Sequence, residues 1–309
     1  MSLIKLIPDD TNVPFIKLRK IFYAFSIVLV LSSIVIYSAM GMKFGIDFTG
    51  GIMIEVKTAE PGRIGEMRER LKGLNLGSFE LQEFGAPDDI LIRVQPQDGG
   101  EEAQMAAVNA VKQALGDGIE YRRTELVGPK VSDELYWDGL YAVVAAVLAI
   151  LVYVWFRFEW QFGLAAVIAL THDVISTIGI FSLIQHEFNL ATVAAVLTIV
   201  GYSINDTVVV FDRVRENLRK YKTMPMEELL HKSTNDTLSR TTMTSFTTLL
   251  ALVALYLFGG EIIRDFAFAM IWGIVIGTYS SVCVAVPLLL QMGVQRGPRE
   301  DDSTIEQTS

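Results

Sequence analysis

The stretch 190-LATVAAVLTIVGYSINDTVVVF-211 decides the fold class, because it is long and apolar enough to cross a lipid bilayer. About 20 predominantly apolar residues make a membrane-spanning helix. Asp206 lies inside this stretch, where a charged side chain costs roughly 2.5–3.5 kcal/mol on insertion scales. Asn205 precedes it and offers no countercharge. Asp206 is therefore the first candidate for a functional residue in this chain.

Five more apolar segments accompany this one, and 51% of the 309 residues are hydrophobic. That composition is too apolar for a soluble chain of this size. The segments lie at about 21–40, 137–156, 161–184, 241–258 and 266–291. The first is long for the core of a signal peptide and lacks a clear cleavage site before Gly41, which favours a retained anchor. We therefore expect an α-helical membrane protein with six transmembrane helices.

The composition also argues against several classes of protein. A net charge of −9 disfavours nucleic-acid binding, which requires a basic surface. The single cysteine, Cys283, allows no intrachain disulfide and is expected to be a packing residue. The sequence has no glycine-rich phosphate loop of the P-loop type. We expect a protein that is not an enzyme, that uses no cofactor or metal, and that draws its energy from a gradient or a partner.

Lysine and arginine residues predict how the helices are oriented. They precede the first helix, separate the second from the third and the fourth from the fifth, and follow the sixth, whereas the turn 185–189 has none. The positive-inside rule then places both termini in the cytoplasm and the block 41–136 outside. The predicted organisation is a cytoplasmic tail at 1–20, a first helix at 21–40, the external block at 41–136, a five-helix bundle at 137–291 and a disordered cytoplasmic tail at 292–309.

The external block is predicted to be a small α+β domain. Apolar residues alternate with polar ones in several short runs, which is typical of strands. The strands are expected at 43–48, 51–58, 78–84, 90–95 and 119–127, and the helices at 63–74 and 101–116. With 43–58 as the first strand region, the order is β-α-β-β-α-β, that of a ferredoxin-like fold. A cytoplasmic amphipathic segment is expected near 213–238, with a helix at 224–236 along the membrane surface, where its leucines meet lipid or protein.

Three predicted helices carry polar residues that could meet inside the bundle. His172 and Asp173 lie in the third, and Arg240 opens the fifth. Asp206 is about five residues from the cytoplasmic end of the fourth, or roughly 8 Å, so it lies at a depth similar to that of Arg240. Polar residues also recur at helical spacing around each of these positions: Ser176 and Thr177; Tyr202 and Ser203; Thr244, Thr247 and Thr248. These faces could form a seam that holds water and relays protons.

Structural explanations remain open for most of these residues. Arg240 could anchor its helix to lipid headgroups, and His172 with Asp173 could form a static hydrogen-bonded pair. A structural role is harder to assign to Asp206, which is deeper and has no countercharge beside it. Gly273 and Gly277 form a GxxxG pattern, which indicates close helix packing rather than a gate.

Three stretches resemble the SecF family, the smaller half of the SecD–SecF protein-export complex in the RND superfamily. They are 45-GIDFTGG-51, 128-GP-129 and 201-GYSINDTVVVFDRVREN-217. The motif residues are Gly45, Asp47, Phe48, Gly50 and Gly51. The resemblance implies an RND-type half of six helices, a separate SecD polypeptide as heterodimer partner, and a place in the bacterial cytoplasmic membrane.

The resemblance also implies a function. SecD and SecF use the proton motive force to assist preprotein export through the SecYEG channel after the SecA-driven step, with YajC as a further indirect partner and the unfolded preprotein as substrate. It assigns proton transport to Asp206 and Arg240, and makes His172, Asp173 and Asn205 further candidates.

Two other functions are compatible with an apolar six-helix chain. One is a small-solute or ion exporter that works as a homo-oligomer, although a large external domain is more than such a pathway requires. The other is an intramembrane aspartyl protease using Asp173 and Asp206, although 203-SIND-206 lacks the glycine-rich motif that such a site would want.

Overall fold

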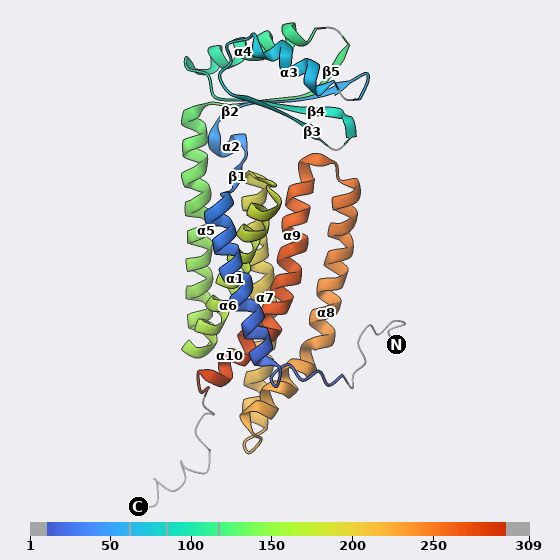
Figure 1. Ribbon diagram of the computed structural model, residues 1–309. Coiled ribbons are helices and arrows are strands. Elements are labelled where there is room, and N and C mark those ends of the chain that lie inside the picture. The colour runs from blue at the N-terminus through green and yellow to red at the C-terminus, as the bar shows by residue number, and fades with distance from the viewer. Residues whose placement is uncertain (1–10, 62, 85, 117, 295–309) are drawn as a thin grey trace, which may run out of the picture.

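The computed structural model describes residues 11–294 except 62, 85 and 117, and within these residues six helices are long and apolar enough to cross a membrane (Figure 1). They are α1 (Arg19–Met40), α5 (Pro129–Arg157), α6 (Trp160–Ile184), α7 (Leu190–Lys220), α8 (Met226–Phe258) and α9 (Glu261–Ser280), which continues into η1 (Ser281–Ala285) and α10 (Val286–Gln291). The predicted six-helix membrane fold is confirmed. Residues 1–10 and 295–309 of the two predicted tails lie outside the described residues.

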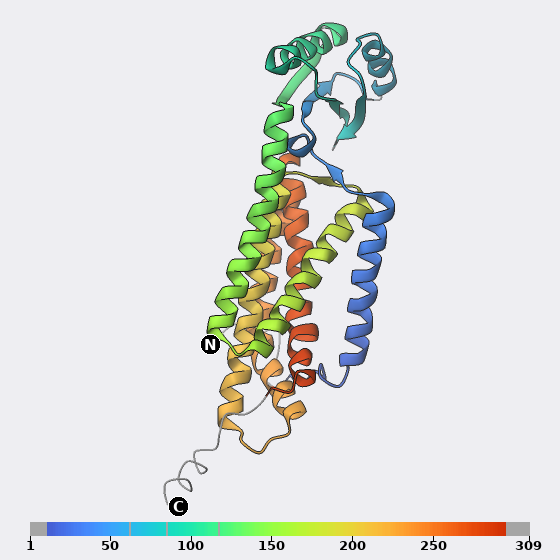
Figure 2. The same cartoon turned by 90° about the vertical axis from the view of Figure 1, so that its left-hand side faces the viewer.

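The middle of the bundle is formed by α6, α7 and α9, and Figure 2 shows α1 and α5 on opposite sides of it. Only 11% of the apolar window of α1 and 6% of that of α5 is buried, against 72% for the helix from Ile263 to Gln291. The outer helices therefore present most of their apolar side chains to lipid or to another chain.

The α+β domain lies beyond the end of the bundle where α1 ends and α5 begins (Figure 1). Its elements are β2 (Gly51–Thr58), α3 (Ile64–Lys72), β3 (Phe79–Phe84), β4 (Ala86–Val94), α4 (Gly100–Leu115) and β5 (Ile119–Val127). The antiparallel sheet has the strand order β3-β4-β2-β5, which confirms the predicted ferredoxin-like domain.

Alternation along the central strands decides how this domain packs. Ile52, Ile54 and Val56 of β2 are fully buried together with Leu71 of α3 and Val111 of α4. Both helices therefore cover one face of the sheet, and the other face turns towards the membrane bundle (Figure 1). The edges of the sheet are β3 and β5.

The prediction of a strand at 43–48 is wrong for the residues after Phe44. Only β1 (Lys43–Phe44) is a strand, and it pairs in parallel with β6 (Glu187–Phe188) of the outer turn between α6 and α7. Residues Ile46–Thr49 then form the short helix α2. The chain reverses at Gly50 and Gly51, whose φ angles of +68° and +114° suit glycine.

The predicted surface helix at 224–236 is also wrong as a separate element. Its residues form the first turns of α8, which begins after Pro225 and continues into the bundle. Leu229 and Leu230 are fully buried against a core that includes Phe211 and Val214 of α7. The apolar face therefore packs on α7, which itself extends to Lys220, and not on lipid.

Candidate functional site

Asp206 is a buried carboxylate at the interface of α7 and α8. It is 8% exposed, and its Oδ1 accepts a hydrogen bond of 2.8 Å from Oγ1 of Thr241. Its Oδ2 is buried and has no hydrogen-bond partner among the described residues. A buried polar atom without a partner is rare and requires an explanation. Oδ2 is the atom of this site that is free to carry a proton or to bind water.

Arg240 and Asn205 lie next to this site without bonding to it. Both side chains are exposed on the surface of the described chain, Arg240 on α8 and Asn205 on α7. Within the described residues, Arg240 makes no hydrogen bond or ion pair with Asp206. Asp206 and Arg240 therefore lie near each other, as predicted. A direct contact between them requires movement of the arginine side chain.

Asp173 and His172 form a second buried cluster, on the α6 side of α7. Asp173 is 1% exposed, and its Oδ1 lies 3.0 Å from Nδ1 of His172. Its Oδ2 accepts hydrogen bonds from Ser203 of α7 at 2.6 Å and from Ser280 of α9 at 2.8 Å. The carboxylate therefore joins three helices, whereas Nε2 of His172 has no partner among the described residues.

Buried hydroxyl groups lie near the two carboxylates. Ser203 and Asp206 are three residues apart on α7, about one helical turn. Ser281 links Ser203 and Thr207 on this turn of α7, because its Oγ lies 2.8 Å from Oγ1 of Thr207 and donates to the backbone oxygen of Ser203 at 3.4 Å. Ser280, Ser281, Thr207 and Thr241 were not predicted from the sequence. A serine pair inside the apolar segment 266–291 was the signal that could have found the first two.

Ser281 lies where the last transmembrane helix changes its winding. Residues Ser281–Ala285 form a fully buried π-helical turn, and Pro287 follows two residues later. A proline has no N–H to donate to the carbonyl four residues back, and its ring clashes with that carbonyl. Single π-turns inside α-helices are often found at functional sites. Pro287 therefore disfavours regular α-helical winding here, and the π-turn places Ser281 between Ser203 and Thr207.

The glycines of α9 bring this helix close to α7. A Cβ atom on Gly273 would overlap the side chain of Ile199, and one on Gly277 would lie 3.2 Å from Cβ of Ser203 and 3.6 Å from Oδ2 of Asp173. The close packing predicted from GxxxG is confirmed. It also has a consequence for the site, because it lets Ser280 reach Asp173.

The polar face of α8 differs from the predicted one. Thr241 and Ser245 are buried and point into the bundle, with Ser245 2.6 Å from Oγ1 of Thr278. Thr244 and Thr247 are exposed and donate to carbonyls of their own helix. Of the predicted stripe, only Thr248 meets another helix, through Tyr202 at 3.4 Å.

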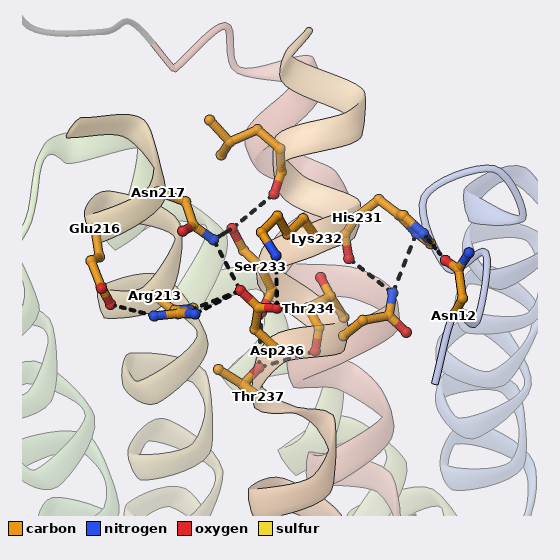
Figure 3. A network of polar contacts seen from close by, with 12 residues as sticks. Asn12, Arg213, Glu216, Asn217, His231, Lys232, Ser233, Thr234, Asp236 and Thr237 are labelled. Atoms are coloured by element: carbon orange, nitrogen blue, oxygen red, sulfur yellow. Dashed lines mark hydrogen bonds and ion pairs between the residues drawn. The ribbon is translucent and has the colours of Figure 1, made fainter. Parts of the chain in front are cut away.

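The far end of the family-like stretch 201–217 locks α7 to α8, as Figure 3 shows. Arg213 forms an ion pair of 2.8 Å with Asp236, and Asn217 donates to Ser233 at 2.9 Å. Asn235 in turn holds the segment before α1, donating to the backbone oxygen of Val13 at 3.2 Å and accepting from its N–H at 2.9 Å. These residues fix the helix that carries Asp206.

The GIDFTGG motif joins the α+β domain to α7. Oδ2 of Asp47 accepts a hydrogen bond of 2.9 Å from the N–H of Leu190, the first residue of α7. Phe48 packs with Phe44, Tyr136 and Phe188, at ring-centre distances of 6.0–6.2 Å. A Cβ atom on Gly51 would lie 2.5 Å from the carbonyl oxygen of Val94. The motif is thus a joint between the sheet and the helix of Asp206.

Charged side chains add to this joint. Arg93 of β4 forms an ion pair with Glu187 of β6, and Lys43 donates to Gln82 at 2.8 Å. Burial, and then the charge of Arg93, lower the pKa of Lys43. A polar pocket of about 160 Å³ lies beside these contacts, between the sheet and the outer turns. The domain therefore meets the bundle through polar and charged contacts beside a small pocket.

Comparisons with known proteins agree with these features. Residues 107–295 match the family model for the protein export membrane protein SecD/SecF, C-terminal, and residues 38–61 match that for the SecD/SecF GG motif. A protein translocase subunit SecF of Cereibacter sphaeroides is 46% identical over 97% of this chain and 95% of its own length. A protein translocase subunit SecDF of Brucella abortus is 41% identical over 97% of this chain but only 39% of its own length.

Two solved structures are similar. The crystal structure of SecDF, a translocon-associated membrane protein from Thermus thermophilus, matches 93% of this chain and 40% of its own with a TM-score of 0.84 at 34% identity. A SecDF crystal structure in a super-membrane-facing form matches all of this chain and 41% of its own with a TM-score of 0.68 at 33% identity. The two forms therefore differ in shape although their identities to this chain are nearly equal.

Proposed function

This chain belongs to the SecF subunits of the SecD/SecF protein-export family, and from that premise we propose that it uses the proton motive force to assist preprotein export through the SecYEG channel. It acts after the SecA-driven step, in the bacterial cytoplasmic membrane, with YajC as an indirect partner. Both termini lie in the cytoplasm and the α+β domain lies outside. The clustering of lysine and arginine at the end of the bundle away from that domain supports this orientation.

A SecD half completes the transporter. The SecDF relatives span both halves, and this chain covers about two fifths of them. Asn205, Arg240, Thr244 and Thr247 are exposed on neighbouring faces of α7 and α8. Polar side chains at membrane depth usually face the bundle interior or a water-filled cavity, not lipid. This face is therefore where SecD packs.

The observation that carries the proposal is Asp206, with its buried and unpartnered Oδ2. In the proton cycle, Oδ2 takes up a proton while Thr241 holds the other oxygen in place. Release follows when the guanidinium of Arg240, the residue beside Thr241, turns inward from the SecD-facing surface, because a nearby positive charge favours the ionised carboxylate. Asp173 and His172 are further candidates for the pathway, and Ser203, one helical turn from Asp206 on α7, donates a hydrogen bond to Asp173.

The test is Asp206→Asn in vesicles that contain this chain, SecD, SecYEG and SecA. An amide has nearly the shape of a carboxylate but cannot be protonated in this way. We expect the variant to insert and to keep ATP-driven export, but to lose the stimulation produced by an imposed pH gradient. Asp212→Asn is the matched control, because Asp212 is on the same helix but half exposed and paired with Arg157. Unchanged stimulation in Asp206→Asn would rule out an obligatory protonation of this residue.

A further inference from the structure

A groove of about 620 Å³ runs along the side of the bundle between α1, α6 and the η1–α10 segment. Its walls are mainly aliphatic, with Ile27 and Leu31 on α1, Ile168 and Ile175 on α6, and Val284 and Leu288 beyond. Ile27 and Leu31 are 58% and 56% exposed. The groove is thus an apolar depression on the side of the bundle, and it is open to the membrane.

The position of the groove matches one leaflet of the bilayer. Tyr23 and Gln291 line one end, and they lie near the start of α1 and at the end of α10, away from the α+β domain. His172 lines the other end, at the middle of α6. From Tyr23 to Leu31, eight residues of helix rise about 12 Å, close to half of the roughly 30 Å hydrocarbon core.

A buried polar atom at the interface end has no partner. Oη of Tyr23 is inaccessible to water and makes no hydrogen bond within the described residues. Buried tyrosine hydroxyl groups usually find a partner, and tyrosine is enriched at the headgroup level of membranes. Tyr23 lines the groove, so a turn of its side chain towards the groove would let an oxygen atom of a lipid headgroup or glycerol ester accept this hydrogen. Lys20 is exposed, lies three residues before Tyr23 on α1 and therefore on the same side of the helix, and suits a phosphate.

We propose that this groove is a specific phospholipid site in the leaflet away from the α+β domain. Tyr23 donates its hydroxyl hydrogen to the lipid, and one acyl chain lies along the groove as far as His172. A protein partner fits this surface less well, because the exposed polar side chains at membrane depth, Asn205 and Arg240, lie on α7 and α8. The groove is instead built by α1, α6 and α10.

A lipid in the groove would have a consequence for the buried carboxylate cluster. His172 contacts Asp173 through Nδ1, and its unpartnered Nε2 is buried beside the groove. Water that filled the groove would give protons a second route to Asp173. An acyl chain excludes that water, so that Ser203 and Ser280 remain the hydrogen-bonded route from the other helices. The lipid site itself does not depend on proton coupling.

The experiment places the full chain in nanodiscs of phosphatidylethanolamine and phosphatidylglycerol that contain a phospholipid with a diazirine in its acyl chain. After irradiation, adducts are mapped by mass spectrometry. We expect adducts at Ile27 and Ile168 to exceed those at Leu148 and Val152 of α5 by about fivefold. Leu148 and Val152 are both 55% exposed and serve as the reference for ordinary lipid contact. Comparing discs with and without phosphatidylglycerol shows whether the headgroup charge contributes.

Two variants make the test decisive. Ile168→Trp fills the groove and should return labelling to the α5 level, whereas Leu148→Trp should leave it unchanged. Tyr23→Phe keeps the shape but removes the hydroxyl, and should lower labelling by about threefold to tenfold, the size of one hydrogen bond. If Ile168→Trp does not fold, Tyr23→Phe alone decides. Uniform labelling of α1, α5 and α6 would overturn the proposal. So would a photo-crosslink from position 168 to another protein in native membranes.

Discussion

At the scale of single residues, the site is defined by which carboxylate oxygens have partners. Asp173 uses both of its oxygens, with His172, Ser203 and Ser280 as partners, whereas Asp206 leaves Oδ2 unpaired. Satisfied buried networks rigidify a protein, and partly satisfied ones are the places where ions or water act. The structure therefore favours Asp206 as the residue that changes state and Asp173 as the one that holds helices together.

Arg240→Lys tests whether the arginine acts on Asp206. Lysine keeps the positive charge and can reach lipid headgroups equally well, but it lacks the planar fork of the guanidinium. If Arg240 turns inward during the cycle, we expect gradient-driven export to fall by about tenfold, the loss expected for one hydrogen bond to a charged group. Vesicle export with an imposed pH gradient measures this. Arg219→Lys, in the last turn of α7, is the control. Full activity of Arg240→Lys would leave Arg240 only a role in anchoring its helix to lipid headgroups.

Thr241→Val tests which face of α8 meets Asp206. Valine has the shape of threonine but cannot donate a hydrogen bond, so both oxygens of Asp206 would be unpaired. An unsatisfied buried group costs about 1–3 kcal/mol, and we expect a corresponding drop in the melting temperature of the purified protein in detergent. Thr244→Val is the control, because Thr244 lies three residues further along α8, is exposed and donates only to a carbonyl of its own helix. The melting temperature of this variant should change little. Equal effects of the two variants would contradict the observed rotation of α8.

At the scale of helices and strands, the sequence predicts spans and strand order well but rotation poorly. The six apolar segments and the alternation in 51–58 and 90–95 each have one strong physical cause, burial of a face or immersion in lipid. The rotation of α8 has no such cause, because Thr241 and Thr244 are both polar and only contact with α7 distinguishes them. The strand at 43–48 failed because Asp47 caps α7, a helix far along the chain.

The π-turn of the last transmembrane helix escaped the sequence analysis for a similar reason. Pro287 indicates an irregular helix, but whether the irregularity is a kink or a π-turn depends on the helices packed around it. The same holds for Ser280 and Ser281, which become parts of the site only because Gly277 allows α9 to approach α7.

Pro287→Ala should separate stability from function at this element. Alanine can donate its N–H to the carbonyl of Cys283 and allows a regular α-helix, which removes the local cause of the π-turn. We expect an equal or higher melting temperature, together with reduced gradient-driven export, because a regular helix would turn Ser281 away from Thr207. Ala285→Val is the control, because it changes the volume of a buried side chain and leaves Pro287 in place. It therefore distinguishes loss of the π-turn from poorer packing. Export at the normal level in Pro287→Ala would show that the π-turn is not needed.

At the scale of the whole molecule, α7, the helix of Asp206, is continuous from its contacts with α8 at one end to the joint with the α+β domain at the other. At one end Arg213 and Asn217 fix it to α8, and at the other Asp47 holds its first turn. A movement of α7 would therefore reach the domain directly. The sequence alone could identify the motif but could not show that it caps this helix, because the contact joins residues 143 positions apart.

The final prediction is that the α+β domain must move relative to the bundle during gradient-driven export. The two solved SecDF forms match this chain with TM-scores of 0.84 and 0.68 at nearly equal identity, so relatives adopt different shapes. In this chain the movable contact would be the pair Arg93 and Glu187, which links β4 to the outer turn. In a Cys283→Ala background, we would introduce Arg93→Cys and Glu187→Cys and join them with a short bismaleimide that contains a reducible disulfide.

Crosslinking should stop gradient-driven export, because the domain could no longer leave the outer turn, and reduction should restore it. ATP-driven export should be unaffected, which excludes general damage. Each single-cysteine variant treated with the same reagent controls for loss of the ion pair and for modification itself. A rigid docking domain, by contrast, would export normally with the crosslink complete. That result would confine the action of the proton to the transmembrane helices.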